Sequence, residues 1–95
     1  MLLASLLVCQ RHLRRRAQIP ALAAAVRAGR ELPPVQLVLD GEGRHRIHDG
    51  HHRATAYVLA GRTHLQPWEY VVLPLEPRPA FGTLAELAGR SSLTG

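Results

Sequence analysis

Lysine and asparagine are absent from this 95-residue sequence, and cysteine occurs once, as Cys9. A single cysteine excludes a disulfide within the chain and is typical of proteins that work in a reducing compartment. All twelve Lys or Arg positions are Arg, and with seven Asp and Glu the formal net charge is +5. This basicity favours a polyanionic partner. A GC-rich codon bias would also replace lysine and asparagine, so charge alone does not decide the function.

Apolar runs long enough to cross a bilayer are also lacking. The opening run, Met1–Val8, is similar to the apolar part of a secretion signal, but the arginines follow it instead of preceding it. We therefore expect a cytoplasmic protein that does not associate with membranes. The run itself predicts a short edge strand followed by a turn, and it leaves a homo-oligomeric contact open.

Hydrophobic residues make up 46% of the chain and charged residues 20%, which is typical of a folded globular protein. Ninety-five residues suffice for one domain with a modest core, so we predict a single domain over residues 1–95.

The first half of the chain predicts a helix and a β-hairpin. Pro20 suits the first turn of a helix, and three-four apolar spacing predicts a helix over Pro20–Ala28. The apolar, β-rich stretch Val35–Leu39 predicts an inner strand. Turn residues over Asp40–Gly43 connect it to a second strand over Arg44–His48.

The second half predicts a helix over Gly50–Ala60 that ends at Gly61, then a strand over residues 64–73 with a bulge at Pro67. Within this strand Trp68 and Tyr70 share a face, where they either stack a base or pack at the core or its rim, and packing is the favoured interpretation.

A short helix is predicted near the C-terminus, over about residues 83–89. Thr83 and Glu86 have the spacing of a capping box, in which each side chain bonds the other's backbone amide. Residues 90–95 are expected to be frayed.

The stretch from Asp49 to Arg53 lies where a strand passes directly into a helix. Asp49 is a favoured N-cap residue, and Gly50 lets a ligand approach the backbone. His51, His52 and Arg53 place cationic side chains at the positive end of the helix dipole, at a cost that a bound anion would relieve. The pattern predicts a phosphate site, with Asp49 as cap, magnesium partner or catalytic base.

A second basic stretch is a candidate nucleic-acid contact, and the alternative is a solvated surface. Its arginines are Arg11, Arg14, Arg15 and Arg16. The six histidines do not have the spacing of metal ligands, so no metal site is predicted.

The order of these features is similar to the ParB/sulfiredoxin superfamily, specifically to the small ParB-like domains, over about residues 18–73. The resemblance rests on Leu32-Pro33-Pro34 before the first strand, the Asp40-Gly41 turn, and the run Asp49-Gly50-His51-His52-Arg53-Ala54 between strand and helix. It implies a compact α+β domain with a small mixed sheet flanked by helices. It also implies that Gly50, His51, His52 and Arg53 bind the phosphates of a nucleotide, ATP or CTP, with or without Mg²⁺.

The branches of this superfamily differ in the loop. Sulfiredoxins carry Gly-Cys-His-Arg, and His51 replaces the reactive cysteine here, which argues against reductase chemistry. Partition ParB proteins carry Gly-Glu-Arg-Arg, which Gly50 and Arg53 match at its ends. Free-serine kinases carry Asp-Gly-His-Thr-Arg, from which only His52 differs, but the acidic base near their N-terminus has no counterpart in Cys9-Gln10-Arg11-His12.

We therefore expect a nucleotide- or phosphate-binding domain. One alternative is a DNA-binding ParB-like module, including the nuclease-like activity attributed to some such domains. The other is a small-molecule kinase or nucleotide hydrolase of the free-serine-kinase type.

Overall fold

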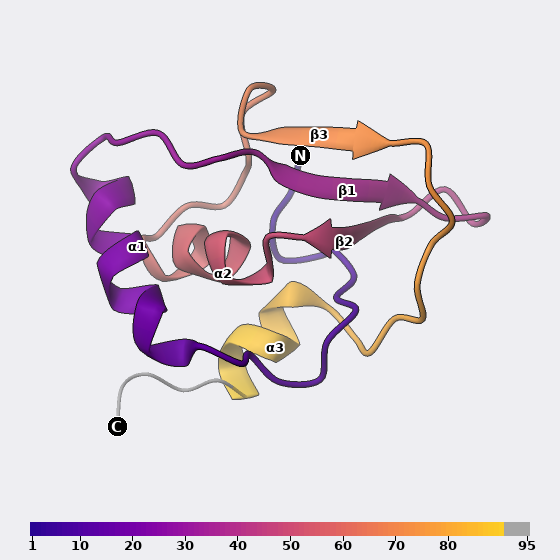
Figure 1. Cartoon of the computed structure of the whole chain (residues 1–95), viewed down its shortest axis with the longest axis horizontal. Coiled ribbons are helices and arrows are strands. Elements are labelled where there is room, and N and C mark those ends of the chain that lie inside the picture. Colours follow the sequence, from indigo (N-terminus) through magenta and orange to yellow (C-terminus); the bar gives the residue numbers. More distant parts are fainter. Residues whose placement is uncertain (91–95) are drawn as a thin grey trace.

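The computed structural model describes residues 1–90, which form three α-helices, one short 3-10 helix and a three-stranded sheet (Figure 1). In chain order the elements are η1 (Arg16–Gln18), α1 (Ile19–Arg27), β1 (Val35–Leu39), β2 (His45–Asp49), α2 (His51–Leu59), β3 (Tyr70–Leu73) and α3 (Leu84–Arg90). The predicted α+β class is confirmed.

The sheet has the order β2-β1-β3, with β1 antiparallel to β2 and parallel to β3. The sheet is therefore mixed, and β1 is its inner strand, as predicted. The hairpin turn is held by Asp40, whose Oδ1 accepts hydrogen bonds from the amides of Glu42 and Arg44, each at 2.9 Å. Its Oδ2 accepts one from Arg46 at 3.0 Å, and these donors lower the pKa of the Asp40 carboxyl.

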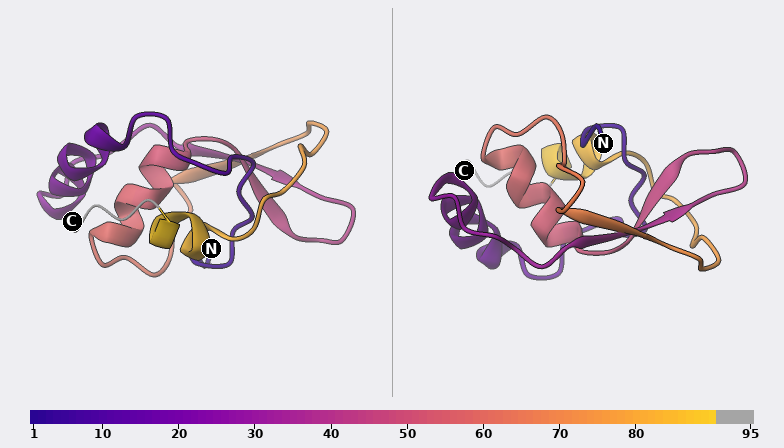
Figure 2. Two further views of the ribbon diagram at one scale, coloured as in Figure 1. Left: turned by 90° about the horizontal axis from the view of Figure 1, so that it is seen from below. Right: turned by 90° about the horizontal axis from the view of Figure 1, so that it is seen from above.

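Helix α2 lies at the centre and packs against α1, α3 and β1. Its buried Ala54, Ala56 and Tyr57 join the main core with Leu37 and Ile47, which pair across the hairpin. Helix α1 lies at one end of the molecule, and the β1–β2 turn lies at the other (Figure 2). Within residues 1–90, no helix combines the length and the apolar character needed to cross a bilayer.

The N-terminal run does not form the predicted edge strand. A turn in which the Leu6 amide donates to the Leu3 carbonyl interrupts it, so that Leu2 and Leu7 form only isolated bridges. Leu7 exchanges hydrogen bonds with β2: its amide donates to the His45 carbonyl at 3.0 Å, and its carbonyl accepts from the Ile47 amide at 2.8 Å.

The neighbouring residues of this run bond the segment that leads into α3. The Val8 amide donates to the Gly82 carbonyl at 2.9 Å, and its carbonyl accepts from the Phe81 amide at 2.8 Å. The Leu84 amide donates to the Leu6 carbonyl at 2.7 Å. The beginning of the chain therefore lies between β2 and residues 81–84.

The predicted helices agree with α1, α2 and α3 to within one or two residues. Gly61 ends α2 with a positive φ of 89°, and its neighbour Arg62 donates its amide to the Tyr57 carbonyl. The predicted capping box is also confirmed, since the Thr83 amide donates to Glu86 Oε1 at 3.1 Å and the Glu86 amide donates to Thr83 Oγ1 at 3.3 Å. The end was predicted to be frayed from Arg90, but Arg90 is the last residue of α3. The rest of that predicted end, residues 91–95, lies outside the described residues.

The strand predicted over residues 64–73 is wrong in its first half, because β3 begins only at Tyr70. Before it, the Glu69 amide donates to the Gln66 carbonyl at 2.9 Å, and Glu69 Oε1 accepts from the Gln66 amide at 2.7 Å. These two bonds close a turn around Trp68. The expectation that Trp68 packs is wrong as well, since 67% of this residue is exposed.

Candidate functional site

Helix α2 begins at a backbone turn that only glycine adopts readily. Gly50 is the N-cap residue with φ 102°, and no side chain of residues 1–90 caps the helix. Asp49 is therefore not the N-cap, contrary to the prediction. The Ala54 amide makes the first helical bond, to the Gly50 carbonyl at 2.8 Å. Helix geometry thus leaves the amides of the first turn without intrahelical acceptors.

The carboxylate of Asp49 instead contacts Arg53, with 3.2 Å between Oδ2 and the guanidinium Nη2. Arg53 Nη1 also donates to the carbonyls of Pro33 and Pro34, at 2.9 and 3.1 Å. These contacts fix the guanidinium beside Gly50, where an added Cβ would lie 3.0 Å from Nη2. They use three of the five N–H donors of Arg53, so two have no acceptor within residues 1–90.

His51 points into the protein and is only 3% exposed. Its Nε2 accepts a hydrogen bond from the Cys9 amide at 2.9 Å, which assigns the proton of the neutral ring to Nδ1. Burial, followed by the charges of His52, Arg78 and His48, lowers the pKa of His51 to about 4, although Asp49 opposes the shift. His51 is therefore a neutral acceptor near pH 7 and not a cation.

His52 also accepts a hydrogen bond from a backbone amide, in a different part of the N-terminal segment. Its Nε2 accepts from the Arg15 amide at 3.0 Å, and burial together with the charge of Arg15 lowers its pKa. The second basic stretch, which sequence analysis treated separately, is therefore attached to the first turn of α2. Its four arginines are exposed, and the Arg11 guanidinium lies 4.8 Å from the centroid of the Phe81 ring.

Arg78 is a residue of this region that sequence analysis missed, because it lies in a proline-rich connector with no motif. Its guanidinium donates to the His48 carbonyl at 3.2 Å and lies 3.4 Å from His48 Nε2. Its own carbonyl accepts from Arg46 at 2.5 Å. With Arg46 it opposes the effect of burial on Cys9, whose pKa nevertheless remains raised, so that the thiol stays protonated.

The start of α2 thus brings together Gly50, Arg53 and the first-turn amides, while both imidazoles are already engaged with backbone. It offers hydrogen-bond donors to an anion. Residues 1–90 contain no group of three or more His, Cys, Asp or Glu side chains that could hold a metal ion. Any Mg²⁺ held by Asp49 would depend on oxygen ligands from a bound phosphate or water.

Comparison of the chain with protein-family models, with curated proteins and with solved structures gives no match. The functional assignment therefore rests on the geometry of the site.

Proposed function

We propose that this chain is a ParB/sulfiredoxin-like domain that binds the phosphate groups of a nucleotide, ATP or CTP, or of another phosphate compound at the start of α2. The observation that carries the proposal is the uncapped first turn after Gly50, beside a guanidinium that is already fixed in place. First-turn amides carry partial positive charge and have no other acceptor within the helix.

Charge also favours an anion over a cation at this position. The arginine stretch that begins at Arg11 is attached to His52 through Arg15. Arg53 contacts Asp49 and Arg78 contacts His48, the two residues that precede Gly50. Asp49 is the nearby carboxylate, and its charge is partly neutralised by Arg53. With phosphate bound, we propose that the exposed carboxylate of Asp49 shares a Mg²⁺ ion with it.

A thermal-shift experiment tests this site with ATP, CTP and inorganic phosphate, each with and without Mg²⁺. A ligand at about one hundred times its Kd stabilises the native state by about 2.7 kcal/mol. For a domain of this size the melting temperature should rise on the order of 10 °C. Arg53→Ala should abolish the shift.

Arg27→Ala is the matched control, because Arg27 also donates to a carbonyl of α2, that of Leu59 at 2.8 Å, but at the opposite end of the helix. It should lower the melting temperature of the free protein yet preserve the ligand shift. The proposal fails if no compound shifts the transition, or if the shift survives in Arg53→Ala.

DNA binding is the second candidate function, favoured by the attachment of Arg15 to the start of α2. A surface that contacts several phosphates loses affinity steeply with added salt, and a single phosphate site loses less. Arg14→Ala with Arg16→Ala should weaken DNA binding and reduce its salt dependence. The same double variant should leave the nucleotide shift unchanged.

Turnover is a separate question for the same site, whether as a kinase or as a nucleotide hydrolase. An exposed carboxylate beside a bound phosphate can accept a proton from an attacking hydroxyl. Release of phosphate from ATP or CTP that disappears in Asp49→Asn, while the thermal shift persists, would favour a catalytic function for Asp49.

A further inference from the structure

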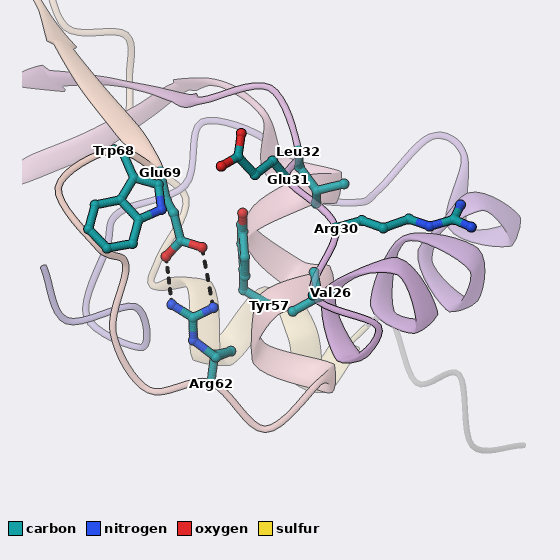
Figure 3. A pocket seen from close by; sticks show the side chains of 9 residues that line it. Val26, Arg30, Glu31, Leu32, Tyr57, Arg62, Trp68 and Glu69 are labelled. Carbon is teal, nitrogen blue, oxygen red and sulfur yellow. Dashed lines mark hydrogen bonds and ion pairs between the residues drawn. The ribbon is translucent and has the colours of Figure 1, made fainter.

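A cavity of about 210 Å³ lies away from the start of α2, between the end of α1, the middle of α2 and the turn before β3 (Figure 3). Val26 and Leu32 form its apolar wall, and Tyr57 stands between this wall and Trp68. The volume is below the roughly 300–1,000 Å³ of pockets that bind drug-sized ligands. It suits one side chain or a small organic group.

One wall of the cavity is an ion pair that is already satisfied. Arg62 contacts both carboxylate oxygens of Glu69, with Nη2 to Oε1 at 2.6 Å and Nη1 to Oε2 at 3.2 Å. Oε1 also accepts the Gln66 amide at 2.7 Å. The Arg62 guanidinium lies over the Tyr57 ring, 5.2 Å from its centroid. These groups shape the cavity but have little capacity left for a charged ligand.

Two side chains at the rim remain available. Trp68 is 67% exposed, although a tryptophan this accessible forgoes much of the burial that its ring favours. Glu31 is exposed and forms no hydrogen bond or ion pair with any other residue of the described chain. Its carboxylate extends toward Trp68, whereas the neighbouring Arg30 extends away from both (Figure 3).

We infer that this pocket binds an organic cation, a guanidinium or alkylammonium group, between the indole of Trp68 and the carboxylate of Glu31. The face of a tryptophan ring attracts cations more strongly than the other aromatic rings do. A carboxylate adds charge-assisted hydrogen bonds to the same group. An anion would meet the carboxylate of Glu31 instead, because Arg62 already balances the charge of Glu69. The cation belongs either to a free small molecule or to an arginine or lysine side chain of a partner protein.

Fluorescence provides a direct measurement, because Trp68 is the only tryptophan in the chain. The full chain is titrated with arginine amide, with citrulline amide as its neutral isostere, and with a short peptide that carries one arginine. Arginine amide should change the emission of Trp68 saturably, and citrulline amide should bind about tenfold more weakly or worse. Saturation by the peptide alone would identify a partner's side chain as the source of the cation.

Glu31→Gln should weaken the binding of the cation by at least about tenfold, since it removes the charge and keeps the shape. Glu76→Gln, an exposed glutamate outside the pocket, is the matched control and should leave affinity unchanged. Equal affinity for the cation and its isostere, unchanged binding in Glu31→Gln, or no saturable response to either arginine ligand would each overturn the inference. None of these outcomes depends on phosphate binding at Arg53.

Discussion

The Nε2 atom of His51 lies 2.9 Å from the backbone nitrogen of Cys9 and accepts its hydrogen bond. A protonated imidazole has no lone pair for this amide, so the contact requires a neutral ring. Residues 9 and 51 are joined only while that condition holds, and stability should therefore depend on pH.

Acidification should destabilise the protein over a window set by His51. Its pKa falls from the usual 6.5 to about 4 on folding, so the unfolded chain binds a proton more readily between these values. The stabilising contribution is complete above pH about 6.5 and is lost as pH falls toward about 4. It amounts to about 3 kcal/mol, with a slope of at most about 1.4 kcal/mol per pH unit. Denaturant titrations across this range measure it.

The comparison for this prediction is His51→Gln, whose amide oxygen can accept the Cys9 hydrogen bond without titrating. Its pH dependence should be flatter than that of the unaltered chain. His12→Gln, at an exposed position, should retain the original slope. Equal slopes in all three proteins would contradict the role of His51.

Gly50→Ala should destabilise the fold by more than backbone strain alone. Gly50 has φ 102° and a Cβ would lie 3.0 Å from Arg53 Nη2, whereas Gly43 has φ 79° and open space around it. Gly43→Ala should cost about 1–2 kcal/mol through strain. Gly50→Ala adds displacement of Arg53, and chemical denaturation of the two variants compares these costs. A smaller loss for Gly50→Ala would count against the fixed position of Arg53.

His52→Ala should loosen the basic stretch, because it removes the acceptor of the Arg15 amide. A backbone hydrogen bond of this kind contributes about 0.5–1.5 kcal/mol, which corresponds to roughly two- to tenfold more frequent local opening. Trypsin cleavage after Arg14, Arg15 and Arg16 should accelerate by that factor. His12→Ala serves as the control, and equal cleavage rates in the two variants would refute the prediction.

The ion pair of Arg62 with Glu69 should be stronger than the ion pair of Arg53 with Asp49. Glu69 and Arg62 form a bidentate, half-buried pair, and we expect a coupling energy of about 1–2 kcal/mol from a double-mutant cycle to alanine. In the pair of Asp49 with Arg53 the aspartate is 67% exposed, so the same cycle should give about 0.5 kcal/mol or less. The reverse order would show that solvent exposure does not determine these couplings.

Local sequence signals predicted most of the secondary structure. Pro20 marks the start of α1 and Gly61 marks the end of α2, through backbone constraints that need no tertiary partner. The Asp40–Gly43 turn likewise determines the hairpin through local hydrogen bonds. Thr83 bonds Glu86 within one helical turn. Each of these interactions spans only a few residues, so a short stretch of sequence is enough to predict it.

The site was less predictable, because its contacts join distant residues. Asp49 has the side chain of a favoured N-cap, but Arg53 competes for its carboxylate. His51 and His52 suit a phosphate ligand by type, yet burial and backbone donors from residues 9 and 15 make them neutral acceptors. The large apolar ring of Trp68 favours burial, but this residue lies in the Gln66–Glu69 turn and is exposed to solvent. The sequence shows which side chains can form hydrogen bonds and ion pairs, but the tertiary structure determines the partner of each.

The position of residues 6–8 between β2 and residues 81–84 has a consequence for folding. The bonds to residues 81–84 join segments separated by most of the chain length. Because closing so long a loop costs entropy, we expect them to form after the hairpin and α2. If residues 6–8 detached, backbone groups of residues 81–84 would lose their hydrogen-bond partners, and the reverse is also true. We expect residues 1–90 to unfold in a single cooperative transition, with the N-terminal run among the last segments to become ordered during folding.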